Sequence, residues 1–300
     1  MRKIEFPSGK KFGICLTHDV DRIDKKWWHC IYYFMKTRRF YHIKTLLTKW
    51  KNNPYWNFDK IMALEDKYGV RSTFFFLNET KKLELLNPKT YPLSLGYYDI
   101  NDPNVVNIIR ELDKNGWEIA LHGSYDSYKN QDLLLKEKIT LEKILGKRVI
   151  GVRQHFLNLD IPNTWQIQKK VGFKYDASFG FRDRVGWRDG KYLPFRPFEE
   201  DDFLVIPLTI MDVALERSSK SLKEAAEKVE AILKYAERRG CLVTVLWHQR
   251  VFNENEFPGW SKLYERIIQE GIKRKAWITK CDEVVEWIGL AFGKDDLKNT

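Results

Sequence analysis

The sequence lacks long apolar runs. None of its 300 residues belongs to an apolar stretch of the roughly 20 residues that a bilayer-spanning helix needs. Residues 1–11 also lack the apolar segment of a secretory signal. These absences argue against a membrane-spanning protein, and we expect a cytoplasmic location.

Cysteine and linker sequence are scarce too. The four cysteines form no Cys-x-x-Cys pair, which argues against a zinc ribbon and against a disulfide framework. They are scattered along the chain as Cys15, Cys30, Cys241 and Cys281. No stretch rich in Ser, Gly or Pro divides the chain. We therefore expect a single domain over residues 1–292, followed by a polar tail at 293–300.

Acidic residues are missing altogether from residues 25–58, which we name the basic aromatic insertion. The whole chain has a formal net charge of +11, which suits an anionic partner such as a phosphorylated substrate or a membrane surface. The insertion can lie on anionic lipid, or it can bind a phosphorylated glycan or nucleic acid. Alternatively, its rings pack on the rest of the protein while its charges stay in water. Its basic and aromatic residues include Lys25, Lys26, Trp27, Trp28, Tyr32, Tyr33, Phe34, Lys36, Arg38, Arg39, Phe40, Tyr41, Lys44, Lys49, Trp50 and Lys51.

Apart from this insertion, short apolar runs alternate with segments of helical periodicity. Such alternation predicts parallel βα units of the α/β class, and the number of repeats favours a barrel over an open sheet. The expected strands are residues 12–17, 70–77, 117–121, 149–152, 203–208, 241–247 and 276–279. The expected helices are 58–68, 104–115, 133–145, 221–239, 260–274 and 282–292.

Two carboxylates, Asp19 and Asp21, follow the first expected strand. Side chains alternate along a strand, so both should lie on the same face, where two like charges repel unless a cation lies between them. A divalent metal held by one carboxylate, with a water deprotonated by the other, would use this arrangement for catalysis. The alternative is a strand end followed by a turn, where Asp is common anyway.

Histidines also follow expected strands. His122, His155 and His248 each come at or just after a strand end, and Arg153 precedes one of them by two residues. A lone histidine at a strand end is usually structural, but in a barrel the carboxyl ends of different strands converge on one face. Only six histidines are present, and His18 lies at such an end as well. This convergence predicts an active site.

The order of these motifs resembles that of the polysaccharide deacetylases of carbohydrate esterase family 4, which share the nodulation-protein-B-type homology domain. The resemblance spans residues 12 to about 287. Thr-His-Asp-Val-Asp at 17–21 is similar to the family's Thr-Phe-Asp-Asp, and His-Gly-Ser-Tyr-Asp at 122–126 to its His-Ser/Thr-x-x-His. Arg-Gln-His-Phe at 153–156 resembles Arg-x-Pro-Tyr/Phe, and Val-Leu-Trp-His at 245–248 resembles Leu-x-x-His. The resemblance implies a distorted (β/α) barrel of about seven parallel strands.

The resemblance also implies roles for individual residues. Asp19 would be the catalytic base, Arg153 would orient it, and His248 would be the general acid. Asp21 and His122 would be ligands of zinc or another divalent metal.

The third metal ligand is open on the sequence alone. Asp126 stands where the family has its second histidine, and a carboxylate oxygen can also coordinate. His155 stands where the family has proline, two residues from Arg153. Both are candidates.

The activity that the resemblance implies is hydrolysis of N-acetyl groups on amino sugars. Phe156 lies in the loop that would supply an oxyanion-binding N–H. Trp187 and Trp260 lie in loop-like segments and would serve as platforms for sugar rings, unless they pack on the barrel rim. A nucleotide- or lipid-linked amino sugar fits the positive charge, and peripheral membrane contact would then be expected.

Other functions are compatible with the same residues. An allantoinase-like relative would hydrolyse a non-sugar amide at the same metal. A metal-free relative would merely bind glycan or lipid head groups, although the Asp19 and Asp21 pair is costly without a cation. No nucleic-acid recognition motif is present, so we expect no nucleic-acid partner.

Overall fold

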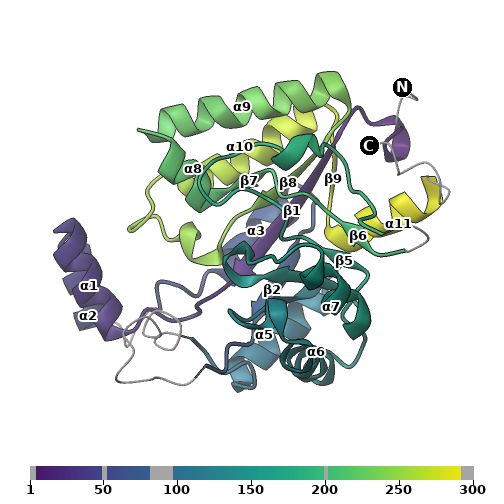
Figure 1. Cartoon of the computed structure of the whole chain (residues 1–300). Coiled ribbons are helices and arrows are strands. Elements are labelled where there is room, and N and C mark those ends of the chain that lie inside the picture. Colours follow the sequence, from purple (N-terminus) through teal and green to yellow (C-terminus); the bar gives the residue numbers. More distant parts are fainter. Residues whose placement is uncertain (1–4, 49–52, 82–96, 199–201, 292–300) are drawn as a thin grey trace.

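The protein forms a curled sheet of parallel strands covered by helices (Figure 1). The computed structural model describes residues 5–48, 53–81, 97–198 and 202–291. The strands pair in the order β6-β5-β4-β3-β2-β1-β8-β7, and β9 pairs with β1. Within the described ranges no ladder joins β6 to β7, so the sheet is a distorted (β/α) barrel that does not close. The strands are β1 (Gly13–Val20), β2 (Thr73–Leu77), β3 (Glu118–Gly123), β4 (Gly151–Gln154), β5 (Tyr175–Asp176), β6 (Leu204–Val205), β7 (Ile210–Met211), β8 (Leu242–Leu246) and β9 (Trp277–Thr279).

The helices lie on the outer faces of this sheet. In Figure 1, α9 and α10 cover one side of the sheet and α5, α6 and α7 the other, while α1 and α2 project from one end. No helix in the described ranges is long and apolar enough to cross a membrane. The helices are α1 (Trp27–Thr37), α2 (Tyr41–Thr48), α3 (Phe58–Lys67), α5 (Pro103–Lys114), α6 (Gln131–Leu145), α7 (Asn163–Val171), α8 (Asp212–Ser218), α9 (Leu222–Arg239), α10 (Trp260–Lys273) and α11 (Cys281–Ala291).

Strand β1 is the centre of the sheet. On one edge, its residues 13–17 pair with β8. Its residues 13–15 pair with β9 and its residues 17–20 with β2. Because a strand has only two edges, β9 and β2 lie end to end along the other edge. All eight residues of β1 are buried, as expected for a parallel strand covered on both faces.

The fold class expected from the sequence is confirmed, with two additional strands. Alternation of strands and helices was visible, but β5 and β7 have only two residues each, too few to show a periodicity. The strand expected over 203–208 was too long, since β6 ends at Val205. Pro207 has no N–H to donate and cannot continue a ladder.

Some sequence predictions fall outside the described residues. These are the polar tail at 293–300 and residues 49–52 of the basic aromatic insertion. The remainder of that insertion includes α1 and α2.

Helix α6 supports the carboxyl end of β3 through a buried carboxylate. Ser124 N donates to Glu137 Oε2 at 3.2 Å, and the Ser124 hydroxyl contacts Oε1. Burial raises the pKa of Glu137 to about 7, although the two Ser124 hydrogen bonds oppose the rise. The folded protein therefore binds a proton that the unfolded chain releases near pH 4.5.

Replacing Glu137 with Gln should make stability less dependent on pH. The carboxyl contribution is fully present below the unfolded pKa and is lost as the pH rises through about 7. Urea unfolding should show similar stabilities for wild type and Glu137→Gln at pH 4.5. At pH 8.5 the variant should gain about 3 kcal/mol relative to wild type. If the difference in stability between Glu137→Gln and wild type were the same at both pH values, the raised pKa of Glu137 would be contradicted.

Candidate active site

Polar side chains gather at the carboxyl end of the sheet. Asp19 lies in β1 and Asp21 directly follows it, while His122 lies in β3. The parallel register pairs His122 with Arg153 of β4, so both reach the same edge. The structure thus brings together six of the residues expected from the sequence, Asp19, Asp21, His122, Arg153, His155 and His248.

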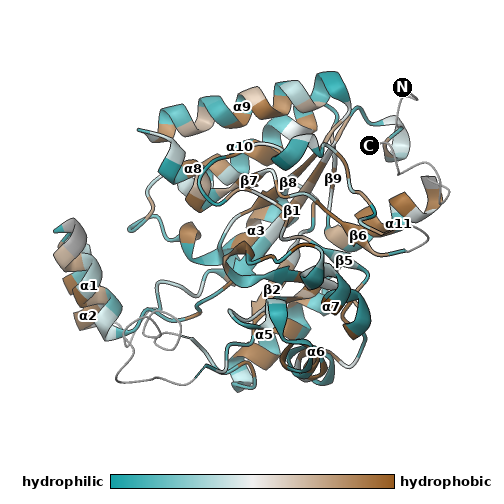
Figure 2. Ribbon diagram, in the orientation of Figure 1, coloured by the Kyte–Doolittle hydropathy of each residue, from teal (hydrophilic) through white to brown (hydrophobic). Residues whose placement is uncertain are grey.

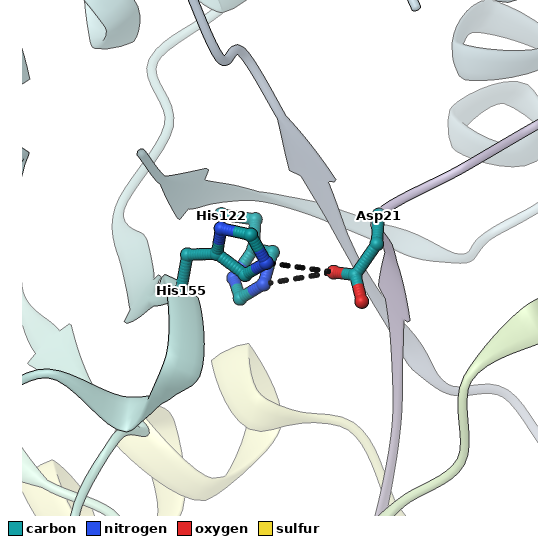
Figure 3. A group of neighbouring side chains, drawn as sticks. All are labelled: Asp21, His122 and His155. Carbon is teal, nitrogen blue, oxygen red and sulfur yellow. Dashed lines mark ion pairs between the residues drawn. The ribbon is translucent and has the colours of Figure 1, made fainter. Parts of the chain in front are cut away.

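Asp21, His122 and His155 form a group that could hold a metal ion, with one ligand atom from each residue within 4.8 Å of the others. Figure 3 shows both imidazole rings turned toward one carboxylate oxygen. Asp21 Oδ1 lies 3.2 Å from His122 Nε2 and 3.9 Å from His155 Nε2. Two imidazole nitrogens and a carboxylate oxygen are ligand types that zinc takes, and three protein ligands leave a position open.

The hydrogen bonds and charges around this group set its protonation. His122 Nδ1 lies 2.9 Å from Arg153 O, and because a carbonyl only accepts, Nδ1 donates and Nε2 is the nitrogen that faces Asp21. Although burial opposes it, Asp19 and Asp21 raise the pKa of His122, so a metal at Nε2 would displace a proton. Asp21 Oδ1 is buried and makes no hydrogen bond to the described residues. Burial lowers the pKa of His155 to about 4, so its ring is neutral at pH 7.

The charge on Asp21 is also favoured. Burial by itself raises the pKa of this carboxyl, but three neighbouring histidines, His248 foremost, outweigh burial and hold the pKa well below its usual value. An ionised carboxylate beside neutral His155 is the state that coordinates a cation.

Asp126, the other candidate for the third ligand, lies elsewhere. Its Oδ2 makes an ion pair with Lys81 Nζ at 2.8 Å, and its side chain is 37% exposed. Asp126 therefore does not belong to the group of three possible ligands.

Asp19 is held by a buried arginine. Arg153 Nη1 donates to Asp19 Oδ1 at 2.7 Å and to Thr17 Oγ1 at 2.9 Å, and Nε donates to Ala177 O at 2.9 Å. Both side chains of the pair are almost fully buried. The other carboxylate oxygen, Oδ2, lies 3.6 Å from His122 Nε2. One oxygen is thus fixed and the second faces the possible metal ligands.

His248 has a carboxylate partner that the sequence analysis missed. His248 Nδ1 lies 2.7 Å from Asp212 Oδ1, and the His248 backbone N donates to Oδ2 at 2.8 Å. Although burial opposes it, Asp212 and Asp21 together raise the pKa of His248 to about 9. In the sequence, Asp212 could have been found by its position directly after the short strand β7. Asp21 has the same position after β1.

His18 does not belong to this cluster. It lies between Thr17 and Asp19 on β1, so alternation directs it to the opposite face. There its Nε2 lies 3.0 Å from Glu65 Oε1 and its Nδ1 2.6 Å from Trp247 O. His18 is a buried structural residue, so its position at a strand end was misleading.

Comparisons with known proteins identify the fold. The sequence matches no protein-family model and no curated protein. A protein assigned as a polysaccharide deacetylase from Mycobacterium smegmatis superposes with a TM-score of 0.61 at 17% identity, over 96% of this chain and 94% of the other. Another, from Pseudomonas aeruginosa PAO1, gives 0.62 at 16% identity, over 96% and 95%. This is the polysaccharide deacetylase fold. Puue allantoinase shares it, with a TM-score of 0.63 at 15% identity over 95% and 93%.

The three expected substrate-binding aromatics take different places in this polysaccharide deacetylase fold. Phe156 is 51% exposed, and its ring centroid lies 4.3 Å from that of His155, beside the possible metal ligands. Trp187 donates to Leu242 O at 2.8 Å, at the amino end of β8 and so at the opposite end of that strand from His248. The Trp260 ring is tilted against that of Trp247, with ring centroids 5.7 Å apart, and it packs on the core.

A cleft of about 550 Å³ is lined in part by Tyr97, whose ring contacts that of His155. Residues near both ends of the basic aromatic insertion and residues around the start of α5 line it. Trp56 and Tyr97 line it together with polar side chains such as Asp99 and Asn104. The Tyr97 ring lies 5.9 Å from the His155 ring, which places the cleft next to the cluster. Neither Trp56 nor Tyr97 was singled out as a site residue in the sequence.

Proposed function

We propose that this protein is a metal-dependent amide hydrolase that removes N-acetyl groups from an amino sugar or a glycan precursor. The observation that supports it is the convergence of Asp21, His122 and His155 with two carboxylate-paired side chains, Arg153 and His248. The proteins named as polysaccharide deacetylases that share the fold support the same reaction class.

Zinc or another divalent ion would be held by Asp21, His122 and His155. When bound, such an ion would polarise the amide carbonyl and lower the pKa of a water molecule. We place His155 as the third ligand because Asp126 is paired with Lys81. The Arg153 carbonyl fixes the His122 ring so that Nε2 is presented.

Asp19 would act as the general base. Its Oδ1 is occupied by Arg153, so only Oδ2 faces the cluster and can take a proton there. Arg153 orients the carboxylate and neutralises its neighbourhood without itself reacting.

His248 would act as the general acid. Asp212 accepts from Nδ1, which leaves the Nε2 proton directed toward Asp21 at 3.4 Å. A pKa of about 9 keeps this imidazolium charged at neutral pH. Cleavage of an amide needs an acid for the departing nitrogen, because an amine anion is a poor leaving group.

The cleft beside Tyr97 would hold the sugar. Aromatic faces with carboxylate and amide side chains suit a ring that carries hydroxyl groups. Phe156 would border the same space from the side of His155. A nucleotide- or lipid-linked amino sugar is the substrate class that the net charge of +11 favours.

A second candidate is hydrolysis of a non-sugar amide, since Puue allantoinase has a similar fold. The aromatic cleft favours the sugar. To distinguish the two candidate reactions, the rate of acetate release from acetylated amino sugars would be compared with the rate of allantoin hydrolysis.

Metal analysis tests the proposal without knowledge of the substrate. Protein purified without chelator should contain about one equivalent of divalent metal per chain. Asp21→Asn, His122→Ala and His155→Ala should each lose most of it, since each removes a ligand. Inductively coupled plasma mass spectrometry measures the content.

Asp126→Ala is the matched control. It also removes an acidic side chain, but this side chain pairs with Lys81 and does not belong to the three possible ligands. It should retain the metal. Loss of metal in Asp126→Ala but not in His155→Ala would reassign the third ligand. Absence of metal after zinc is supplied would favour a catalytically inactive glycan- or lipid-binding protein.

A further inference from the structure

Helices α1 and α2 form a hairpin, residues 26–48, that projects from the body of the protein (Figure 1). Figure 2 colours parts of both helices brown, as hydrophobic, and several of their apolar side chains are exposed. Trp27, Ile31 and Met35 recur at every fourth position of α1 and are 56%, 39% and 65% exposed. This spacing places them on one face of the helix. Phe40, between the helices, is 80% exposed and Leu47, in α2, is 75% exposed.

We propose that this hairpin docks on an anionic lipid surface. The exposed apolar side chains would enter the interface between headgroups and acyl chains. Basic side chains such as Arg38 and Lys44, which are exposed on the same hairpin, would contact the anionic headgroups. No acidic residue occurs anywhere in residues 25–58 to oppose that attraction.

The charge and chemistry of the hairpin favour lipid over the other occupants. A second copy of this chain would bring an equally basic hairpin, and two such surfaces repel each other. Nucleic acid would match the charge and could stack on Trp27 or Phe40. However, the aliphatic side chains of Ile31, Met35 and Leu47 offer nothing to a base, whereas they suit acyl chains.

The opposite side of the hairpin is fixed to the barrel. Lys25 is fully buried, with its Nζ 2.5 Å from Glu256 Oε2 and 2.8 Å from His42 Nδ1. Arg39 Nη1 donates to Glu256 O at 3.1 Å, and Tyr41 accepts from Asn253 Nδ2 at 2.8 Å. Packing on the barrel therefore accounts for the buried residues of the insertion. It does not account for the apolar side chains that remain exposed. These contacts hold the apolar face in a set direction.

The location of the hairpin connects docking with the active site. Trp27 is the sixth residue after Asp21, so α1 begins within about 20 Å of that possible metal ligand. Trp56 and Lys26, on either side of the hairpin, both line the cleft. If the proposed function is correct, a docked protein would meet an amino sugar that is linked to a membrane lipid. Docking itself does not depend on that function.

Vesicle sedimentation tests the proposal. We expect the full-length protein to bind vesicles of equal parts phosphatidylcholine and phosphatidylglycerol, and to bind pure phosphatidylcholine at least tenfold more weakly. Arg38→Gln combined with Lys44→Gln should weaken binding to the anionic vesicles about 30-fold, because each basic group near such a surface contributes about 1 kcal/mol. Met35→Ser combined with Phe40→Ser should weaken it at least tenfold. Added salt should weaken wild-type binding.

Leu290→Ser and Lys223→Gln are matched controls, since Leu290 is 90% exposed and the Lys223 side chain 87% exposed outside the hairpin. They should change binding less than twofold. Equal binding to neutral vesicles, or no loss in the hairpin variants, would overturn the proposal. A dimer in sedimentation equilibrium that Met35→Ser and Phe40→Ser dissociate would assign the face to a second copy. Hydrolysis of a soluble acetylated sugar should be unchanged in the Arg38 and Lys44 variant, which separates failure of docking from failure of the proposed function.

Discussion

Asp19→Asn should lower kcat by about 10²- to 10⁴-fold while the bound metal stays at the wild-type level. The amide cannot take a proton, but it keeps the shape of the carboxylate beside Arg153. Asp19 is not one of the three possible ligands, so metal content should be insensitive to the change. Acetate release, measured on any substrate that the wild type hydrolyses, and metal analysis of the same sample give the two readings.

Asp126→Asn is the control for this loss. It neutralises another aspartate at the same end of the sheet, one that pairs with Lys81. Its kcat should remain close to that of the wild type, because Asp126 is not one of the three possible ligands. Asp19→Asn activity above a tenth of the wild-type value would contradict the assignment of the base.

Arg153→Met should destabilise the protein by about 3–5 kcal/mol, because it leaves the buried Asp19 carboxylate without its charged partner. Arg153 is fully buried and also donates to Thr17 Oγ1 and Ala177 O, so those acceptors lose a donor too. Urea unfolding, repeated with and without chelator, measures the loss and separates it from any change in metal affinity.

A double-mutant cycle isolates the charge. Asp19→Asn in the Arg153→Met background removes the unpaired carboxylate, so the double variant should be more stable than Arg153→Met alone. Arg184→Met serves as the control, because Arg184 pairs with Asp183 and both side chains are largely exposed. This substitution should change the free energy of unfolding by less than about 0.5 kcal/mol. A double variant no more stable than Arg153→Met would show that the loss comes from packing.

The face on which the Asp19 and Asp21 side chains lie was predictable from the sequence. An apolar run followed by two carboxylates at alternate positions placed Asp19 and Asp21 on one face, and both indeed lie near His122. This works because side-chain direction in a strand follows the simple period of two. The same rule should have directed His18 away from the site, and only its position at a strand end suggested otherwise.

Other parts of the site depend on contacts that no local pattern contains. Our preference for His155 over Asp126 rests on the ion pair of Asp126 with Lys81, a residue distant in sequence. Trp187 was expected to be a platform for a sugar ring because its segment is loop-like, but its indole N–H donates to the first residue of β8. Such placements are set by tertiary packing between segments, which periodicity and motif spacing do not record.

The shared edge of β1 also concerns how the chain folds. Residues 13–15 complete their hydrogen bonds only when 277–279 arrive, near the end of the chain. Contacts between segments so far apart are slow to form, since closing a long loop costs entropy before any contact compensates for it. During synthesis β1, which bears Asp19, must therefore wait, with one edge partly unpaired, until residues 277–279 have left the ribosome.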